Sequence, residues 1–252
     1  MLHLCLTLSY CGHKVRDRNK SEMVTLYLIN PTSLAKSAAL QQLATDLRLL
    51  KIGIAVVAET WFTSLHTDNL VNIDGYNLFR KDRLNKTAGG VAVHVRDDID
   101  ASFVVLQSEN LSAVTEVLWM ECNYKSVTYY VAGCYYPPKA RYSDDVLKAE
   151  LTRDLEILLG SYSMRNIHQN PFVILIAGDF NSLDCSFMES DFGLEQIVNK
   201  PTHCNHILDK VYTNRPDMYE ADVFISLIKK TSRGLCQTTC RSQCDDLESE
   251  PC

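Results

Sequence analysis

The sequence lacks any apolar run near the ~20 residues that a membrane-spanning helix requires. Its first segment, Met1 to Gly12, carries several leucines but neither a basic region nor a clear small-residue cleavage site. Both absences argue against a membrane segment and against secretion, so we expect an intracellular protein, nuclear or cytoplasmic. A signal peptide in the leucine-containing first segment is the alternative.

Positive charge is also scarce, since 25 Lys and Arg stand against 31 Asp and Glu and the formal net charge is −6. A protein that coats DNA without sequence preference needs an excess of basic residues, so this class does not suit the composition. An acidic site that holds a divalent cation would contribute to such a balance.

A recognisable zinc-binding pattern is missing as well. The chain has ten cysteines, and the densest group has no common zinc spacing and no ligating histidine after it: Cys236, Cys240, Cys244 and Cys252. Free buried thiols are therefore the favoured interpretation of the cysteines, with a metal knuckle in this group as the alternative. Residues 229–252 have no hydrophobic periodicity and end in acidic residues, which predicts a disordered, Cys-rich acidic tail.

The rest of the sequence is long and regular enough for one large domain, because 46% of the 252 residues are hydrophobic. We expect an N-terminal extension over 1–22, the domain over 23–228 and the tail over 229–252. Apolar runs predict strands at 24–29, 52–58, 91–95, 114–122, 127–135, 172–177, 208–213 and 222–228. Leucine periodicity and capping residues predict helices near 40–50, 143–159 and 194–198. Strands outnumber helices and often follow one another directly, which favours two packed sheets flanked by helices.

The most informative motif is Gly178-Asp179-Phe180-Asn181, which ends the apolar run Phe172–Ala177. A carboxylate and a carboxamide two residues apart would emerge together at one rim of a sheet. One can activate a water while the other holds a phosphate oxygen or a metal-bound water. The alternative is an Asx turn, which Asp and Asn favour for local backbone reasons.

Other strand ends carry polar residues that suit a divalent ion and a phosphodiester, namely Asn30, Glu59, Tyr135 and Asp209. Each has a structural alternative: a helix cap, a solvated strand end, a core aromatic and a salt-bridge partner, respectively. Their coincidence at the ends of several apolar strands favours a shared functional site.

These residues stand in segments that resemble the endonuclease/exonuclease/phosphatase superfamily, and in particular the endonuclease domain of non-LTR (LINE-type) retrotransposons. The resemblance spans about Met23 to Ile228 and rests on the order of several short segments: 28–34, 58–61, 75–83, 89–93, 134–138, 178–181, 201–202 and 208–214. It implies an α/β fold built as a four-layer α/β/β/α sandwich, with the site at one edge of the paired sheets.

The resemblance also implies a role for each site residue. Glu59 resembles the principal Mg²⁺ ligand (Mn²⁺ is the alternative metal), with Asn30 nearby holding a metal-bound water. Asp179 resembles the residue that orients and deprotonates the attacking water.

The phosphate side of the site follows from the same resemblance. Asn181 would hold the scissile phosphate, Tyr135 would stabilise charge on the phosphoryl oxygens, and Thr202 would be a weaker phosphate contact. Asp209 would orient a histidine near the C-terminus, which donates a hydrogen bond to the phosphate.

That histidine is where the sequence departs from the superfamily. The family pattern is Ser/Thr-Asp-His, but an ungapped alignment places Thr231 at the Asp and Ser232 at the His. The family's final strand, which follows this motif, also has no counterpart here, so we expect a domain truncated at the C-terminus. His203 or His206, near Asp209 in sequence, is an alternative source of the imidazole.

The sequence therefore predicts a Mg²⁺-dependent phosphodiesterase that nicks DNA by in-line attack of water, with activity impaired by the missing Asp-His pair. The alternatives are an inactive retroelement-derived remnant with a binding role, and a cellular phosphatase of the same superfamily. We expect a monomer that contacts the DNA backbone and no membrane. The basic group Arg80, Lys81, Arg83 and Lys86 is either a phosphate contact or a solvated loop.

Overall fold

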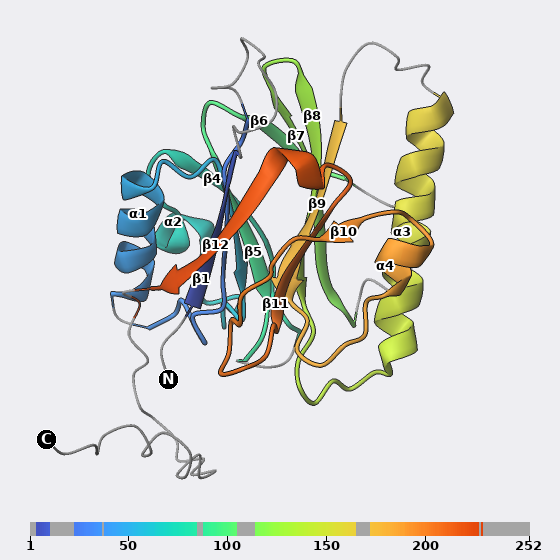
Figure 1. Cartoon of the computed structure of the whole chain (residues 1–252). Helices are drawn as coiled ribbons and strands as arrows, with labels where there is room; N and C mark the ends of the chain where they lie inside the picture. Colours follow the sequence, from blue (N-terminus) through green and yellow to red (C-terminus); the bar gives the residue numbers. More distant parts are fainter. Residues whose placement is uncertain are drawn as a thin grey trace, which may run out of the picture.

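A computed structural model describes residues 4–10, 23–36, 38–84, 88–104, 114–164, 172–226 and 228, and for 4–10, 162–164 and 225 only the backbone. Two six-stranded sheets pack face to face, and helices cover the outer face of each (Figure 1). Helices α1 and α2 lie on one side of the molecule, and α3 and α4 on the other. The four-layer α/β/β/α sandwich expected from the sequence is therefore confirmed.

The first sheet has the strand order β12-β1-β2-β3-β5-β4. Its strands are β1 (Leu4–Tyr10), β2 (Leu26–Ile29), β3 (Ile54–Ala58), β4 (Tyr76–Lys81), β5 (Val91–Arg96) and β12 (Tyr219–Ile225), and its helices are α1 (Ala39–Leu49) and α2 (Asp68–Val71). Strands β2 and β3 are parallel, and the other pairs are antiparallel. Both β2 and β3 therefore end at the same edge of the sheet.

The second sheet has the strand order β10-β11-β9-β8-β7-β6. Its strands are β6 (Asp100–Phe103), β7 (Glu116–Tyr124), β8 (Val127–Tyr135), β9 (Phe172–Asp179), β10 (Glu195–Gln196) and β11 (Asp209–Thr213), and its helices are α3 (Asp144–Met164) and α4 (Phe187–Ser190), with a 3-10 turn at Pro216–Met218. Strands β8 and β9 are parallel, so Tyr135 and Asp179 end neighbouring strands at one edge.

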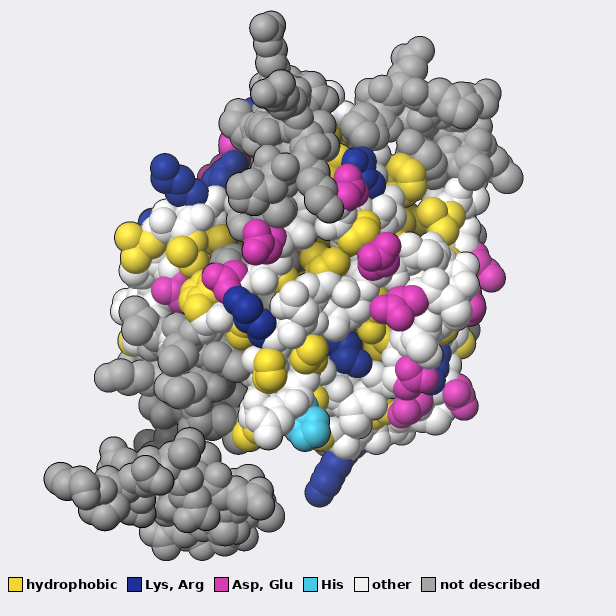
Figure 2. Space-filling view, in the orientation of Figure 1, with side chains coloured by type: hydrophobic (Ala, Val, Ile, Leu, Met, Phe, Trp, Pro, Cys, Tyr) yellow, Lys and Arg dark blue, Asp and Glu magenta, His cyan; other side chains and the backbone are white. Residues whose placement is uncertain are grey.

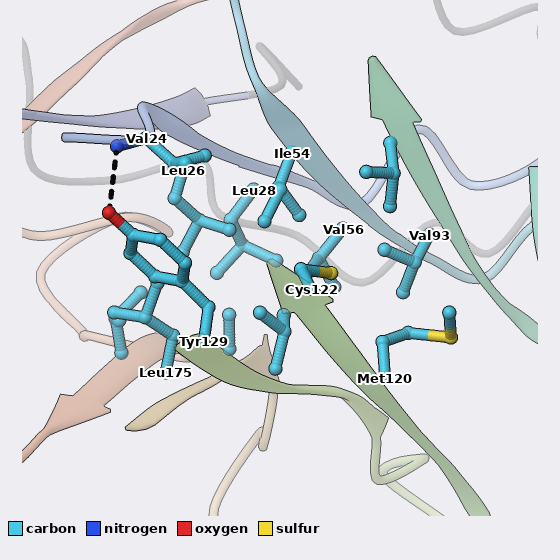
Figure 3. Packing of buried hydrophobic residues seen from close by; sticks show 14 of the residues in the cluster. Val24, Leu26, Leu28, Ile54, Val56, Val93, Met120, Cys122, Tyr129 and Leu175 are labelled. Atoms are coloured by element: carbon cyan, nitrogen blue, oxygen red, sulfur yellow. Dashed lines mark hydrogen bonds between the residues drawn. The ribbon is translucent and has the colours of Figure 1, made fainter. Parts of the chain in front are cut away.

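The main core lies between the two sheets and follows from the alternation of side chains along each strand. In β2, Leu26 and Leu28 point to the other sheet, while Tyr27 and Ile29 pack in the α1 layer. Figure 3 shows Leu26 and Leu28 beside Tyr129 of the second sheet. The phenol oxygen of Tyr129 accepts a hydrogen bond from the Val24 amide at 3.3 Å, which ties the two sheets together.

Two local features differ from the sequence-based expectation. Strand β1 lies before Met23, where we expected the domain to begin, and it pairs with both β12 and β2. The helix expected near 194–198 is wrong, because β10 runs through it and Ile197 donates a backbone hydrogen bond to the Val211 carbonyl at 3.0 Å. The helix α4 comes earlier and is followed by Gly193 at φ 63°. The apolar spacing of Leu194 and Val198 fits both a helix and a strand edge, so it does not decide between them.

The described cysteines include three buried free thiols, at Cys122, Cys134 and Cys185, and the exposed free thiol of Cys204. The Cys-rich tail lies outside the described residues. Among the helices that the structure describes, none has the length and apolar character needed to cross a bilayer.

His94 in β5 leads to a prediction about pH and stability. It is fully buried, and neither ring nitrogen has a hydrogen-bond partner among the described residues. Burial lowers the pKa of His94 from 6.5 to about 4. His94 is therefore neutral in the folded protein, whereas in the unfolded chain it becomes protonated below about pH 6.5. As far as His94 is concerned, the free energy of unfolding therefore keeps its full value above pH 6.5 and decreases as the pH falls toward 4.

We expect His94 to reduce the free energy of unfolding by about 2 kcal/mol between pH 7 and pH 5. Urea unfolding of the wild type and of His94→Leu at both pH values measures the effect, since the variant removes this titration and leaves the other groups. An equal pH dependence of the two proteins would show that His94 is solvated or hydrogen-bonded in solution.

Candidate active site

Five polar residues lie at the ends of strands along one edge of the sandwich. In the second sheet, Tyr135 is the register partner of Asp179, and Asp179 is the register partner of Asp209. In the first sheet, Asn30 directly follows β2 and Glu59 directly follows β3. The side-chain amide of Asn30 donates a hydrogen bond of 2.7 Å to Asp179 Oδ2, so the polar ends of the two sheets meet.

The turn after β9 holds Asp179 in place. Asp179 Oδ1 accepts the backbone amide of Asn181 at 3.0 Å, which is the Asx-type contact considered as an alternative to a functional site. The side-chain amide of Asn181 donates to the Tyr136 carbonyl at 2.7 Å, and Asn181 itself has φ 47°. The Asx turn and the contact to Asn30 occur together, so this turn presents one fixed carboxylate to the edge.

Asp179 and Asp209 form a pair of neighbouring carboxyl groups, in which Asp179 is buried and Asp209 is half-buried with a buried Oδ1 atom. Burial raises the pKa of Asp179, and the hydrogen bonds from Asn30 and Asn181 oppose that rise. Burial also raises the pKa of Asp209, and the neighbouring charge of Asp179 raises it further. Together these effects disfavour a double negative charge on the pair in the absence of a cation.

Glu59 reaches the same place from the first sheet. Its negative charge contributes to the raised pKa values of both Asp179 and Tyr135. For Tyr135 burial is the larger cause, and the pKa lies well above the ordinary tyrosine value. The phenol is therefore neutral at physiological pH and can act as a hydrogen-bond donor, and a hydrogen bond with the Glu59 side chain adds to the rise of its pKa.

The donor set fits a hard divalent cation such as Mg²⁺. Asp209 Oδ1 is buried and has no hydrogen-bond partner among the described residues. The charge of Asp179 acts on Asp209, and the charge of Glu59 acts on Asp179. No group of three or more His, Cys, Asp or Glu side chains in the described part of the chain is arranged to hold a metal. Mg²⁺ is commonly bound through one or two carboxylates and keeps several waters, and Glu59 and Asn30 are the oxygen donors that would hold it.

Thr202 and the nearby histidines lie beside β11. The Thr202 hydroxyl oxygen accepts hydrogen bonds from the backbone amides of Leu208 and Asp209 at 3.1 and 3.0 Å. These bonds hold the backbone where β11 begins. His203 and His206 pair with each other through their backbones. Among the described residues, no hydrogen bond joins either imidazole to Asp209. Thr231 and Ser232 lie outside the described residues.

The basic group at the end of β4 and just after it makes contacts within the chain. Arg80 forms an ion pair with Asp68 at 3.0 Å, Lys81 donates to the Val117 carbonyl at 3.0 Å, and Arg83 pairs with Glu116. Lys86 lies outside the described residues. On the face drawn in Figure 2, the described Lys and Arg side chains stand singly or in small groups among Asp and Glu rather than in one broad basic patch.

Glu116 is a partner of this basic group that the sequence analysis did not single out. A charged residue at the first position of a buried strand is its only signal in the sequence, and that signal does not identify a partner.

No family model matches the sequence, and no curated protein matches it. Among solved structures, the human Nocturnin catalytic domain with a bound sulfate anion matches with 13% identity and a TM-score of 0.50, covering 80% of this chain and 94% of that chain. The endonuclease domain of TRAS1, a telomere-specific non-LTR retrotransposon, matches with 14% identity and a TM-score of 0.49 over 74% of this chain and 82% of that one. An endonuclease/exonuclease/phosphatase family protein from Leptotrichia buccalis matches with 14% identity and a TM-score of 0.46, over 81% and 99%. At these identities the likeness concerns the fold.

Proposed function

We propose that this chain, which has the fold of the endonuclease/exonuclease/phosphatase superfamily, is a divalent-metal-dependent phosphodiesterase that nicks DNA with low turnover. The observation that carries the proposal is the 2.7 Å hydrogen bond from Asn30 to Asp179. It joins the polar strand ends of the two sheets, so that Glu59, Tyr135 and Asp209 lie around the same point.

The chemistry assigned to each residue follows from its surroundings. Asp179 is the base that takes a proton from the attacking water. Its raised pKa makes its carboxylate a stronger base than an ordinary aspartate, and the hydrogen bonds with Asn30 and Asn181 fix its orientation. The neutral phenol of Tyr135 donates a hydrogen bond to a phosphoryl oxygen. Asn181 and Thr202 shape the phosphate side through the turns that they hold.

A divalent cation, Mg²⁺ or alternatively Mn²⁺, would be held by Glu59 with Asn30 nearby, and when bound it supplies Lewis acidity and neutralises developing charge on the phosphate. Asp209 lies beside Asp179 at the same edge, and its Oδ1 has no hydrogen-bond partner among the described residues. The acidic residues therefore act together with the cation rather than as an isolated acid-base pair.

The low turnover follows from the sequence near the C-terminus. Thr231 and Ser232 stand where the superfamily has Asp and His, and a hydroxyl cannot act as a cationic hydrogen-bond donor. Loss of one electrostatic donor to a transition state typically costs ~10²–10³ in rate. DNA as the substrate, and a monomer that acts in the nucleus or cytoplasm, are part of the proposal because of the retrotransposon-like segments in the sequence.

The test is a plasmid-nicking assay with the purified chain and Mg²⁺. We expect slow conversion of supercoiled plasmid to the open circle, loss of that activity with EDTA, and a rate at least tenfold lower for Asp179→Ala. Asp184→Ala is the matched control, because Asp184 is an exposed carboxylate in the loop after the same motif. It should leave the nicking rate unchanged.

Other results would favour the alternatives. A folded wild type that does not nick DNA at any Mg²⁺ or Mn²⁺ concentration would indicate an inactive remnant. Hydrolysis of inositol phosphates without DNA cleavage would move the activity to a phosphatase of the same fold.

A further inference from the structure

We propose that Arg83 and Glu116 form a positioning pair for the candidate site, holding the loop that carries Glu59 and the ring of Tyr135. The inference rests on the proposed function and deepens it, because it assigns the residues that place the metal ligand. Neither residue touches the reacting groups, so the pair acts through the backbone and ring that it contacts.

Glu116 is anchored on both of its carboxylate oxygens. Arg83 Nε donates to Oε1, and the Gly90 amide donates to Oε2 at 2.7 Å. The side chain is buried, with only 3% of Glu116 exposed, and Arg83 is the cation next to it. A buried carboxylate that is bound on both sides leaves Gly90 little freedom to move.

Gly89 and Gly90 connect the Arg83–Glu116 pair to the Glu59 loop by backbone hydrogen bonds. The Gly90 carbonyl accepts the Thr60 amide at 3.2 Å, and the Gly89 carbonyl accepts the Trp61 amide at 2.8 Å. Both glycines have positive φ, 95° and 87°. A Cβ on Gly89 would lie 2.5 Å from Arg83 Nε, so the guanidinium packs directly against this turn.

The Glu59 loop needs such support because of its backbone conformation. Glu59 has φ 59° and Trp61 has φ 60°, a backbone region that strains non-glycine residues and persists where the surroundings fix it. The opposite side of the loop is held by the amides of Ser33 and Leu34, which donate to the carbonyls of Glu59 and Thr60 at 2.9 Å. Removal of the Gly89-Gly90 side would leave the strained loop held on one side only.

Arg83 also contacts a second residue of the site. Its guanidinium lies 5.6 Å from the centroid of the Tyr135 ring, and Glu116 is the register partner of Tyr135 across β7 and β8. The charge of Arg83 opposes the rise of the Tyr135 pKa. The pair therefore sits between the Glu59 loop and Tyr135 and fixes their relative positions.

The first test is amide hydrogen exchange in the double variant Arg83→Met/Glu116→Leu. Removing both charges avoids leaving one buried charge unpaired, so the fold is retained. We expect exchange at the Thr60 and Trp61 amides at least tenfold faster than in the wild type, measured residue by residue by NMR. In parallel, Mn²⁺ titration followed by electron paramagnetic resonance should give a dissociation constant raised at least tenfold.

The matched control is Arg96→Met/Asp98→Leu. Arg96 Nε pairs with Asp98 at 2.6 Å, and its guanidinium lies 6.0 Å from the Tyr124 ring. This control also joins a cation, a carboxylate and a tyrosine, but it is a local and exposed pair at the end of β5 that lies away from Gly90. Exchange at Thr60 and Trp61 and the Mn²⁺ affinity should both stay at wild-type values.

If the double variant does not fold, Glu116→Gln takes its place, because it keeps the shape and removes the charge that pairs with Arg83. The expected acceleration at Thr60 and Trp61 is then about threefold.

The outcomes separate this inference from the proposed function. Unchanged exchange at Thr60 and Trp61 in a folded variant overturns the inference, whatever happens to Mn²⁺. Faster exchange with unchanged Mn²⁺ affinity also overturns it, since the loop would then not place the metal ligand. If the wild type binds no Mn²⁺, the proposed function fails, while faster exchange in the variant still supports the pair.

Discussion

Replacing Thr231 by aspartate and Ser232 by histidine should raise the rate of plasmid nicking by about 10²–10³. The double variant restores the Asp-His pair of the superfamily pattern that the sequence resembles. An imidazolium donates a hydrogen bond to the phosphate in the transition state, and a serine hydroxyl cannot carry that charge. Asp209 would serve as the orienting acceptor, because its buried Oδ1 has no hydrogen-bond partner among the described residues.

The comparison that tests this prediction is a set of initial nicking rates in Mg²⁺ for the wild type, Thr231→Asp, Ser232→His and the double variant. Because groups that act as a unit give non-additive effects, each single variant should gain much less than the double variant. Adding Asp209→Asn to the double variant should remove most of the gain, since the histidine loses its orienting carboxylate.

A folded double variant that remains as slow as the wild type would contradict the prediction. The defect would then lie outside these two side chains. Circular dichroism and thermal unfolding of the variants separate that result from misfolding.

Replacing Gly178 by alanine should lower the free energy of unfolding by about 3 kcal/mol, at the upper end of the usual range for overpacking. A Cβ at this position would lie 2.7 Å from the Cys134 carbonyl carbon and closer still to its oxygen. These are backbone atoms of β8, paired directly with Gly178 in a parallel ladder, so they cannot rotate away. The strands would have to separate between Tyr135 and Asp179.

Gly160→Ala is the matched control, because Gly160 lies in α3 and a Cβ there meets nothing within 4 Å. Alanine is favoured over glycine in a helix, so this variant should gain about 0.5–1 kcal/mol. Urea unfolding of both variants gives the two changes. Equal stability of Gly178→Ala and the wild type would show that β8 and β9 are farther apart in solution than the structure has them.

Much of the sandwich follows from local patterns in the sequence. The run Phe172–Ala177 is apolar and rich in β-branched residues, and it forms β9 with both faces buried. Leu147, Leu151, Leu155 and Leu158 share one face of a helix and pack as expected in the outer layer over the second sheet. Such elements are predictable because the spacing of the hydrophobic residues along a helix or strand can be read from the segment itself.

Elements that depend on distant partners were not predictable in this way. The segment of β1 has leucine at every second position from Leu2 to Leu8, a strand pattern that the sequence analysis did not use, but its place between β12 and β2 is decided by its neighbours, of which β12 is far away in the sequence. The short strand β10 exists because β11 offers it a ladder. In the sequence, Arg83 follows Arg80 and Lys81 and resembles an exposed basic residue. Its partner Glu116 belongs to the second sheet, so the pair could not be predicted.

The sequence by itself determined the sandwich and the polar residues that end its strands, because hydrophobic period and turn residues are encoded locally. It proposed Asn30, Glu59, Tyr135, Asp179 and Asp209 as candidates, and their roles remain predictions. Only the tertiary structure decided that Asn30 reaches across to Asp179, that Asp209 lies beside Asp179, and that Arg83 and Glu116 lie behind the Glu59 loop. The reason is that hydrogen bonds, burial and charge-charge repulsion depend on distances between strands, which only the packing of the two sheets fixes.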